Sequence, residues 1–411
     1  MRATARRCRF CAAPLEHVFA DLGMTPLANS FVAAEQANTM ERFYPLRAYA
    51  CERCWLVQLD QFESSEEIFS DYAYFSSYST SWLEHSRRYV DAMVAQLGLG
   101  ESSLAVEIAS NDGYLLQYFA AHGVPVLGIE PAANVAARAI EQGIPTRVEF
   151  FGVATATALR EELRADLLLG NNVLAHVPDL NDFVGGMKVL LNAGGTITME
   201  FPHLLRLIDE RQWDTIYHEH FSYFSWLTVR RVFEAHGLRL FDVEELPTHG
   251  GSLRIFGCHD DDPREETERA RELAERERAA GLERIETYTA FSATVAADKL
   301  DILTFLIGLR REGLRIAAYG APAKGNTMLN YCGVGPELVE FTCDLNPHKQ
   351  GHLLPGSRIP IHDPQVLRAE RPDVVLILPW NLREEIVEQL AFVREWGGRF
   401  AARAPELRML G

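Results

Sequence analysis

Apolar runs of strand length alternate with helix-length amphipathic stretches through the middle of the chain. The apolar runs span residues 104–110, 124–131, 165–177 and 194–202. Helical patterns cover residues 115–123 and 134–143. Strands that alternate with helices at this spacing are typical of a parallel sheet with crossover helices.

A second, shorter alternation begins near residue 314. Its apolar runs span residues 314–325, 339–347 and 373–380, which predicts a second and smaller α/β domain. Between the two alternations, residues 262–312 are rich in Glu, Arg, Ala and Leu and contain almost no Gly or Pro. This composition predicts one long helix or a pair of helices. We interpret the segment as a solvated connection between the domains.

The pattern divides the chain into four parts. Its 411 residues exceed the roughly 250 to 300 residues that one hydrophobic core fills, so several domains are expected. The predicted parts are a turn-rich, Cys-bearing lobe (1–70), an α/β domain with a helical lead-in (71–260), linking helices (261–313) and the terminal α/β domain (314–411). The lead-in starts with DYAYFSSYSTSW, a stretch dense in aromatic and hydroxyl side chains.

Charge and composition exclude several classes of protein. The net charge of −17 argues against a nucleic-acid partner, because phosphate binding needs clustered Lys and Arg. No run of about 18 apolar residues is present, so no membrane span is expected. The basic start of the chain is followed by Cys and Pro instead of an apolar segment, so we expect no signal peptide. An odd count of seven Cys without such a signal fits a cytoplasmic protein with metal-bound thiolates.

Four of the cysteines form two CxxC pairs, Cys8 with Cys11 and Cys51 with Cys54. Each pair makes a tight turn that points two thiolates at one centre, and two such turns complete a tetrahedral zinc site. All four positions are filled by protein, so the zinc is predicted to be structural and to stabilise a lobe with little core of its own. The alternatives are four unrelated buried thiols and a nucleic-acid zinc ribbon, which the acidic charge disfavours.

The segment EIASNDG follows the first apolar run of the α/β domain and precedes a helix. A turn in this place lets the backbone approach a ligand, with Gly113 at the closest point and Asn111 and Asp112 near the ligand's amino acid end. Glu130 ends the next strand, where an acidic residue typically takes ribose hydroxyls. The turn lacks GxGxxG, which weakens NAD and is tolerable for S-adenosylmethionine. The pattern favours a methyltransferase and leaves open an NAD enzyme or a ligand-free domain.

A cluster of ionisable residues, Tyr217-His218-Glu219-His220, comes after the last predicted strand of this domain, and His176 lies in the loop after residues 165–173. Ligands of open α/β sheets bind beyond the carboxyl ends of the strands, so both segments are expected near the cofactor. A His can act as a general base, a neighbouring Glu can orient it, and a Tyr hydroxyl can donate to an oxyanion. A metal site is an alternative, although HExxH is absent.

The terminal domain contains GAPAKGNT, which follows a strand and precedes a helix. Its backbone N–H groups, with Lys324 and Asn326, are candidates to hold a diphosphate. The alternative is a tight strand-to-helix turn with structural glycines. Further candidates for the nucleotide end of a substrate are Arg254, Trp380 and Asn381.

These pieces together resemble a known family, the C-methyltransferases that act on nucleotide-linked 4-keto deoxysugars. The matching motifs are the CxxC pairs, DYAYFSSYS, EIASNDGYLL, NNVLAHVPDL, YHEHFSYFS, HGGSLR and GAPAKGNT. The resemblance implies a class I Rossmann-like methyltransferase domain for S-adenosylmethionine, an N-terminal zinc-binding lobe and a smaller C-terminal α/β domain. It also implies a thymidine diphosphate sugar as substrate, methylated at carbon 3 beside the ketone of carbon 4, within the biosynthesis of antibiotic deoxysugars.

The resemblance also assigns roles to residues. It implies that His220 is the general base, with Tyr217, Glu219 and His176 as its active-site partners. Tyr72 and Tyr74 lie in the aromatic segment that covers the family's active site, and which of the two is functional stays open. The expected cofactor-binding residues are Glu107, Ser110, Asn111, Asp112, Gly113, Glu130 and Asn172. Ala109 stands where the family pattern has Gly.

The hypothesis that follows is methylation through an enolate. His220 removes the proton next to the ketone, Tyr217 holds the enolate oxygen with help from His176, and the carbon attacks the methyl group. A second hypothesis is a methyltransferase with a non-sugar, nitrogen or oxygen acceptor. A third is a zinc-containing nucleotide-binding or scaffold protein without activity. We expect a monomer or small homo-oligomer.

Overall fold

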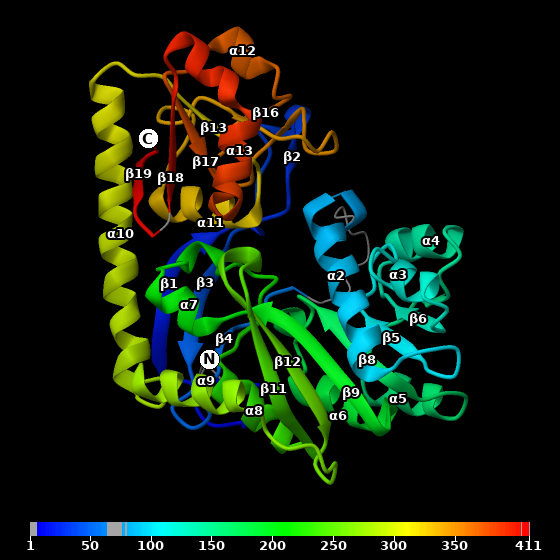
Figure 1. Cartoon of the computed structure of the whole chain (residues 1–411). Helices are drawn as coiled ribbons and strands as arrows, with labels where there is room; N and C mark the ends of the chain where they lie inside the picture. Colours follow the sequence, from blue (N-terminus) through cyan, green and yellow to red (C-terminus); the bar gives the residue numbers. More distant parts are fainter. Residues whose placement is uncertain (1–5, 64–75, 79, 404, 411) are drawn as a thin grey trace.

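The computed structural model describes residues 6–63, 76–78, 80–403 and 405–410 (Figure 1). The described strands assemble into sheets of four, seven and six strands and a two-stranded ribbon. In Figure 1 the six-stranded sheet lies above the four-stranded and seven-stranded sheets, and helix α10 runs along one side of the molecule past both levels. No helix in the described ranges is both long enough and apolar enough to cross a membrane.

The seven-stranded sheet has the order β11-β12-β9-β8-β5-β6-β7. Its strands are β5 (Ala105–Ile108), β6 (Val126–Ile129), β7 (Thr146–Arg147), β8 (Ala165–Asn171), β9 (Leu191–Pro202), β11 (Leu238–Leu246) and β12 (Ser252–His259). Strands β5 to β9 are parallel, and β12 runs antiparallel between β9 and β11. This order confirms the predicted Rossmann-like α/β domain, in which a parallel sheet is connected by crossover helices.

Helices cover both faces of this sheet. They are α2 (Thr80–Leu97), α3 (Leu116–Ala121), α4 (Ala133–Glu141), α5 (Val153–Arg160), α6 (Leu180–Leu190), α7 (Leu204–Asp209) and α8 (Trp226–Glu234). The crossover helices α3 and α4 bury apolar side chains against strands that are themselves buried on both faces. Continuous burial of this kind explains why β5, β6 and β8 are mostly apolar along their length, although β5 contains Glu107 and β8 contains Asp166.

The apolar pattern predicted the sheet only as far as β9, and the structure adds β11 and β12 after it. The reason is that these strands carry charged residues that find partners within the fold. Asp242 on β11 accepts from Arg269 Nε at 2.5 Å, and Arg254 on β12 pairs with Glu244 at 2.8 Å. Paired charges are tolerated in a buried strand, although they interrupt its apolar alternation.

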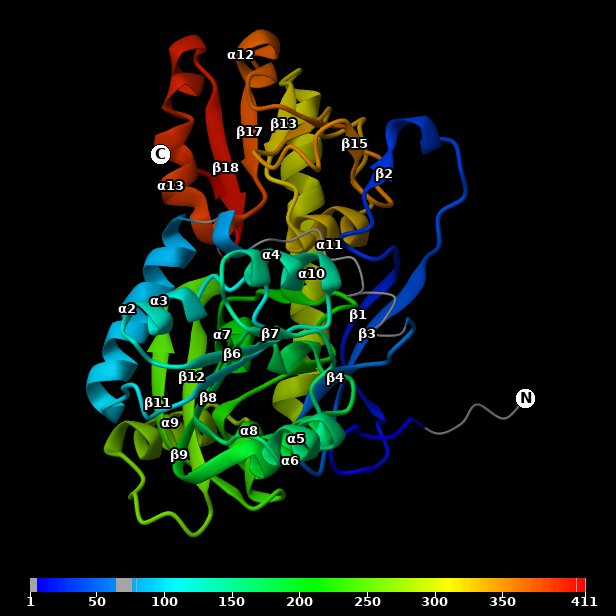
Figure 2. The same ribbon diagram turned by 90° about the vertical axis from the view of Figure 1, so that its right-hand side faces the viewer.

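The four-stranded sheet belongs to the N-terminal lobe, residues 6–63, but the lobe does not supply all of it. Strands β1 (His17–Thr25), β3 (Tyr44–Ala50) and β4 (Val57–Leu59) are antiparallel neighbours. The fourth strand, β10 (Ser222–Tyr223), comes from the middle of the chain and pairs with β4. Figure 2 shows the lobe beside the seven-stranded sheet, with β4 on the side that faces it.

The segment predicted as one helix or a pair is a pair, α9 (Glu268–Ala279) and α10 (Ile285–Arg311). The interpretation of it as a solvated connection is wrong, because α10 buries residues along its whole length, including Tyr288, Val295 and Leu306. Phe291 of α10 stacks on Phe19 of β1 with ring centroids 4.6 Å apart. The helix therefore packs against the N-terminal lobe as well as against the six-stranded sheet.

The six-stranded sheet has the order β16-β14-β13-β17-β18-β19 and is parallel except for β19. Its strands are β13 (Ile316–Tyr319), β14 (Thr342–Cys343), β16 (Ile361–His362), β17 (Val374–Ile377), β18 (Arg399–Arg403) and β19 (Leu407–Met409). Helices α11 (Ala323–Cys332), α12 (Val366–Glu370) and α13 (Arg383–Gln389) flank it. The small strand β15 (His352–Leu353) pairs with β2 (Val32–Ala33), so the N-terminal lobe also reaches this sheet.

A buried ion cluster joins the parts of the chain. Arg403 of β18, 3% exposed, pairs with Asp214 at 3.0 Å and with Asp298 of α10 at 2.9 Å. Asp298 also accepts from the indole of Trp213 at 3.0 Å, and Asp214 accepts from the indole of Trp380 at 2.7 Å. Each buried carboxylate is thus satisfied by donors from a distant part of the sequence.

We expect Arg403→Met to destabilise the protein by about 3 to 5 kcal/mol, because the buried Asp214 would lose its cation and the buried Asp298 would keep only the partly exposed Arg211, at 3.2 Å. Chemical unfolding of the zinc-loaded protein measures this change. The matched control is Arg315→Met, which also removes two carboxylate contacts, at 2.8 and 2.9 Å, but from a side chain that is 42% exposed. That variant should lose about 1 kcal/mol or less. Equal losses in the two variants would contradict the role assigned to the buried cluster.

Candidate active site and metal centre

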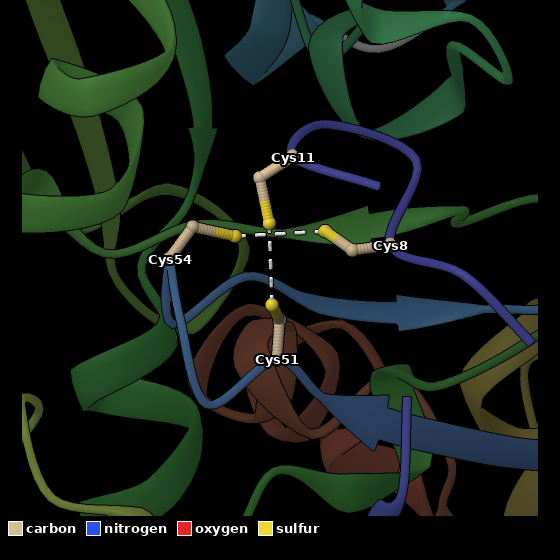
Figure 3. A group of neighbouring side chains, drawn as sticks. All are labelled: Cys8, Cys11, Cys51 and Cys54. Carbon is tan, nitrogen blue, oxygen red and sulfur yellow. Dashed lines mark hydrogen bonds between the residues drawn. The ribbon is translucent and has the colours of Figure 1, made fainter. Parts of the chain in front are cut away.

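The four predicted zinc ligands converge on one point. The sulfur atoms of Cys8, Cys11, Cys51 and Cys54 all lie within 4.8 Å of one another, and the Cys8–Cys54 and Cys11–Cys51 sulfurs are 3.5 Å apart. Figure 3 shows the four side chains pointing inward from two loops. A tetrahedral zinc with bonds of about 2.3 Å places its sulfurs roughly 3.8 Å apart, so the cluster fits zinc.

The two loops of the metal centre have the same backbone shape. The residue after each CxxC turn has a positive φ, which is 57° for Ala12 and 67° for Trp55. Its N–H donates to the backbone carbonyl of the first Cys of the turn at 2.9 Å. Gln58 of β4 donates to the Cys8 sulfur at 3.1 Å. Hydrogen bonds to metal-bound sulfur orient the ligand, so Gln58 belongs to the metal centre although the sequence did not indicate it.

The loop after β5 is the predicted cofactor turn, and its backbone is strained. Ala109, Asn111 and Gly113 all have positive φ, of 57°, 49° and 77°. A Cβ on Gly113 would lie 3.1 Å from Ile144, so the glycine is needed for packing as well as for its conformation. Strained residues concentrate at functional sites, and this loop lies at the carboxyl ends of the parallel strands.

Two of the three acidic residues predicted for the cofactor site are Glu107 and Glu130, and both are buried. Burial raises the pKa of Glu107 well above its ordinary value. Glu130 accepts from the backbone N–H of Asn111 and of Ala132, each at 2.9 Å, and thereby holds the cofactor turn against the end of β6. Each of its oxygens has a second lone pair, so Glu130 retains capacity to accept from ribose hydroxyls.

Several buried polar atoms near the ends of β5 and β8 have no hydrogen-bond partner among the described residues. Ser110 Oγ, Asp112 Oδ1 and Asn172 Oδ1 are among them. An unsatisfied buried group of this kind costs about 1 to 3 kcal/mol, so the site favours a ligand that carries several donors. The ammonium and ribose hydroxyls of S-adenosylmethionine are such donors. The other carboxylate oxygen of Asp112 accepts from the Ser77 hydroxyl at 2.5 Å.

His220 is held as a neutral base. Its Nδ1 lies 3.0 Å from the Thr215 carbonyl, which only accepts, so Nδ1 carries the proton. Nε2 then accepts from the Tyr217 hydroxyl at 2.7 Å. Burial, with the nearby His176, holds the pKa of His220 well below 6.5. The ring is therefore neutral at neutral pH, and its basic nitrogen lies on the side of Tyr217.

Two further histidines lie near His220. The rings of His176 and His220 meet edge to face with centroids 4.7 Å apart, and desolvation lowers the pKa of His176 to about 4. His249, in the HGGSLR motif, has φ 55° and approaches Asn172 at 3.2 Å. His249 was not predicted as a site residue. The signal available in the sequence is the pair of glycines that follows it, and all three residues have a positive φ.

Glu219 points toward the N-terminal lobe. Its Oε1 accepts from the amide of Asn29 at 3.2 Å, and burial raises the pKa of Glu219 to about 7. Asn29 comes from the loop between β1 and β2 and could not be found from the sequence, because no local pattern marks it. The neighbouring His218 also contacts this lobe, with Nε2 3.3 Å from the carbonyl of Pro45 on β3.

The terminal domain contributes a cation to the same region. Lys324, at the start of α11, donates to Asn381 at 2.8 Å and lies 4.3 Å from the centre of the Trp380 ring. Desolvation lowers the pKa of Lys324 to about 8, and the same lysine helps to lower the pKa of His220. Lys324, Trp380 and Asn381 are thus brought together, as predicted for one end of the substrate.

The remaining predicted residues lie elsewhere or are not described. Asn326 donates to the Ala28 carbonyl of the N-terminal lobe at 2.7 Å. Arg254 is buried on β12, where it pairs with Glu200 at 3.1 Å and Glu244 at 2.8 Å, so its charge is balanced by carboxylates of the seven-stranded sheet. Tyr72 and Tyr74 lie outside the described residues.

Comparison with known proteins gives matches along nearly the whole chain. Residues 8–69 match the family described as "Putative zinc binding domain", residues 82–243 "Methyltransferase domain", and residues 247–405 "C-methyltransferase C-terminal domain". C-methyltransferase NovU of Streptomyces niveus is 36% identical over 405 residues, which are 98% of this chain and 96% of that protein. With the four-cysteine cluster, these matches establish S-adenosylmethionine as the cofactor and zinc as the metal.

Among solved structures, the chain is similar over its middle part to magnesium protoporphyrin IX methyltransferase from Synechocystis PCC 6803, at 14% identity and a TM-score of 0.34. That match covers 43% of this chain and 82% of the other. An S-adenosylmethionine-dependent methyltransferase from Clostridium acetobutylicum ATCC 824 matches at 10% identity and a TM-score of 0.34, over 43% of this chain and 91% of the other.

We expect Cys51→Ser to abolish zinc binding and to expose the N-terminal lobe to proteolysis, because the tetrahedral site loses one of its four ligands. Metal analysis of the purified protein, followed by limited proteolysis, measures both effects. The matched control is Cys258→Ala, which removes a buried thiol outside the cluster and should leave the zinc content unchanged. Full zinc occupancy in the Cys51 variant would contradict the assignment.

Proposed function

Because the chain belongs to the C-methyltransferase family, we propose that it methylates a carbon next to the ketone of a nucleotide-linked keto-deoxysugar. The expected acceptor is a thymidine diphosphate 4-keto deoxysugar, with carbon 3 as the methylated position. The observation that carries the proposal is the neutral His220, whose Nδ1 donates to Thr215 and whose Nε2 faces the Tyr217 hydroxyl. S-adenosylmethionine supplies an electrophilic methyl group.

Transfer to carbon needs a base, because a carbon next to a ketone is nucleophilic only after it has lost a proton. His220 can take that proton on Nε2, since its pKa is held below 6.5 and the nitrogen is unprotonated at neutral pH. The Thr215 carbonyl fixes the tautomer and stabilises the ring when it becomes protonated. An amine or alkoxide acceptor would not need an enolate to be formed and stabilised.

The negative charge that develops on the ketone oxygen needs a hydrogen-bond donor. The Tyr217 hydroxyl, which donates to Nε2 in the free enzyme, can donate to that oxygen once Nε2 holds the proton. His176, whose ring is in edge-to-face contact with His220, is a second candidate. Glu219 is expected to support the same loop through its contact with Asn29.

The cofactor is expected to lie across the ends of β5, β6 and β8. Asp112 and Asn172 each direct an unsatisfied oxygen there, and Glu130 remains able to accept from ribose. Glu107, Ser110, Asn111 and Gly113 form the turn and its base. Asn172 also lies 3.2 Å from His249, so the cofactor is expected next to the histidine group.

The nucleotide end of the acceptor is expected at the start of α11. Residues Ala323, Lys324 and Gly325 open this helix, so their N–H groups lack carbonyl partners within it. With the Lys324 cation they can bind a diphosphate, and Asn381 can accept or donate beside it. Arg254 is not part of this proposal, because two carboxylates already engage it.

The principal test combines the enzyme, S-adenosylmethionine and thymidine diphosphate 4-keto deoxysugars in deuterated buffer. We expect a methyl group on the carbon next to the ketone and, without the cofactor, exchange of the proton on that carbon. His220→Asn should lower exchange and methylation together by at least roughly 100-fold, as expected for loss of a general base. The matched control is His218→Asn, which changes a histidine two residues before His220 that contacts the Pro45 carbonyl. This variant should retain exchange.

Two results would contradict the proposal. Exchange that persists in the His220 variant would show that another group is the base. Methyl transfer to nitrogen or oxygen, located by NMR of the product, would show that the acceptor belongs to the second hypothesis.

A separate prediction concerns pH. Lys324 is cationic below its pKa of about 8 and neutral above it, so affinity for the nucleotide sugar should weaken as pH rises past this value. Linkage limits the loss to about tenfold per pH unit. Titration calorimetry at several pH values between about pH 7 and pH 9.5 measures it. Lys324→Arg keeps its charge throughout and should remove this dependence. If the affinity of that variant depends on pH as in the unmodified protein, Lys324 does not bind the nucleotide.

A further inference from the structure

Arg9 lies between the two ligands of the first CxxC turn and belongs to the metal centre through Gln58. The backbone N–H of Arg9 donates to Gln58 Oε1 at 2.8 Å, and the amide of Gln58 donates to the Cys8 sulfur at 3.1 Å. Gln58 is also the residue of β4 that pairs with Ser222 of β10. One side chain therefore connects the metal ligand, Arg9 and the strand that follows His220.

In the part of the chain that the structure describes, the guanidinium of Arg9 makes no ion pair with a carboxylate. It donates to three backbone carbonyls, of Leu59 at 2.5 Å, of Pro178 at 2.9 Å and of Val177 at 3.4 Å. Its planar fork suits this task, because several N–H groups in fixed directions can reach two chain segments at once.

These contacts lead to the chain neighbours of His176 and His220. Val177 directly follows His176 in the chain. Leu59 receives a hydrogen bond for its carbonyl from Arg9, and its own N–H donates to the carbonyl of Phe221 at 3.0 Å, the residue after His220. The Phe221 ring also lies 5.3 Å from the guanidinium carbon. Arg9 thus holds the neighbours of both histidines from the same point.

The loop on which His176 lies holds the metal turn in return. Asn181, at the start of α6, donates to the carbonyls of Arg9 and Phe10, both at 3.1 Å. The loop from Val177 to Asn181 therefore contacts the turn through its side chain and through its backbone. A tetrathiolate zinc centre carries a formal charge of about −2, which favours a cation at this position.

We propose that Arg9 is a positioning residue that sets the relative placement of His176 and His220, so that the zinc centre shapes the active site in addition to folding the N-terminal lobe. The inference rests on the proposed function for its effect on catalysis. The placement itself does not depend on the identity of the acceptor. The effect would reach the reaction through the edge-to-face contact of the two rings and through the Tyr217 pair.

The test compares Arg9→Met and Arg9→Lys in the full zinc-loaded chain, with Arg6→Met as the matched control. Arg6 belongs to the same lobe but is 49% exposed, pairs with Asp60 and lies over the Tyr49 ring, so it contacts neither histidine loop. The protein carries histidine labelled with ¹³C at Cε1, and the ring signals of His176 and His220 are assigned by substitution. Zinc content, affinity for S-adenosylmethionine and the methylation rate are measured on the same samples.

We expect Arg9→Met to retain zinc and cofactor affinity, to move the His176 and His220 signals, and to leave the signal of the remote His122 in place. The turnover number should fall roughly tenfold to 100-fold, since misplacement by about 1 Å has effects of that size. Arg9→Lys should give an intermediate result, because an ammonium cannot reach all three carbonyls. Arg6→Met should match the unmodified protein.

Unchanged histidine signals and an unchanged rate in zinc-loaded Arg9→Met would overturn the proposal. Full recovery in Arg9→Lys would also overturn it, because charge alone would then suffice. If Arg9→Met loses its zinc, Asn181→Ala decides, since it keeps the Arg9 side chain and releases the other contact between the metal turn and the His176 loop. Unchanged histidine signals and an unchanged rate in that variant would then overturn the proposal. Histidine signals that move in an enzyme that methylates no keto sugar would support the placement and refute only the proposed acceptor.

Discussion

The guanidinium of Arg403 brings together two buried carboxylates that lie far apart in the sequence, Asp214 and Asp298. Without it, Asp214 would be an unpaired charge in a dry interior, which is costly, and Asp298 would keep only the partly exposed Arg211. Asp214 also accepts from the Trp380 indole, and the next residue, Thr215, gives its carbonyl to His220. The placement of the terminal domain, of the long helix α10 and of the base therefore depends on one buried cation.

The segment from Asp214 to Tyr223 receives a contact from every part of the molecule. The terminal domain reaches it through Trp380 and through Thr327, which donates to the Ile216 carbonyl at 3.2 Å. The N-terminal lobe reaches it through Asn29 and through the pairing of β4 with β10. The seven-stranded sheet supplies His176. Such convergence explains how a loop with little regular structure can hold a His, a Tyr and a Glu in fixed relation.

The sequence predicted those features that leave a local pattern. Buried parallel strands are mostly apolar along their length, so β5, β6, β8 and β9 were visible although single acidic residues lie within some of them. Charged residues are more frequent in β11, and with Arg254 in β12 they concealed these two strands. The two CxxC turns and the adjacent Tyr217, Glu219 and His220 were visible because their spacing is local. The Thr215 carbonyl was not, because a backbone group has no signature. Asn29 was not, because its partner Glu219 lies 190 residues away.

The pairing of β10 with β4 also bears on how enzymes of this kind can be recombined. The N-terminal lobe looks like a separable module, since it has its own metal and its three strands are consecutive from His17 to Leu59. Its sheet is nevertheless completed by Ser222 and Tyr223, two residues beyond His220. A chimaera that takes its lobe from a relative must therefore inherit an edge that matches this short strand. The junction that matters for such an exchange is this shared edge in space, more than the point at which the two sequences are spliced.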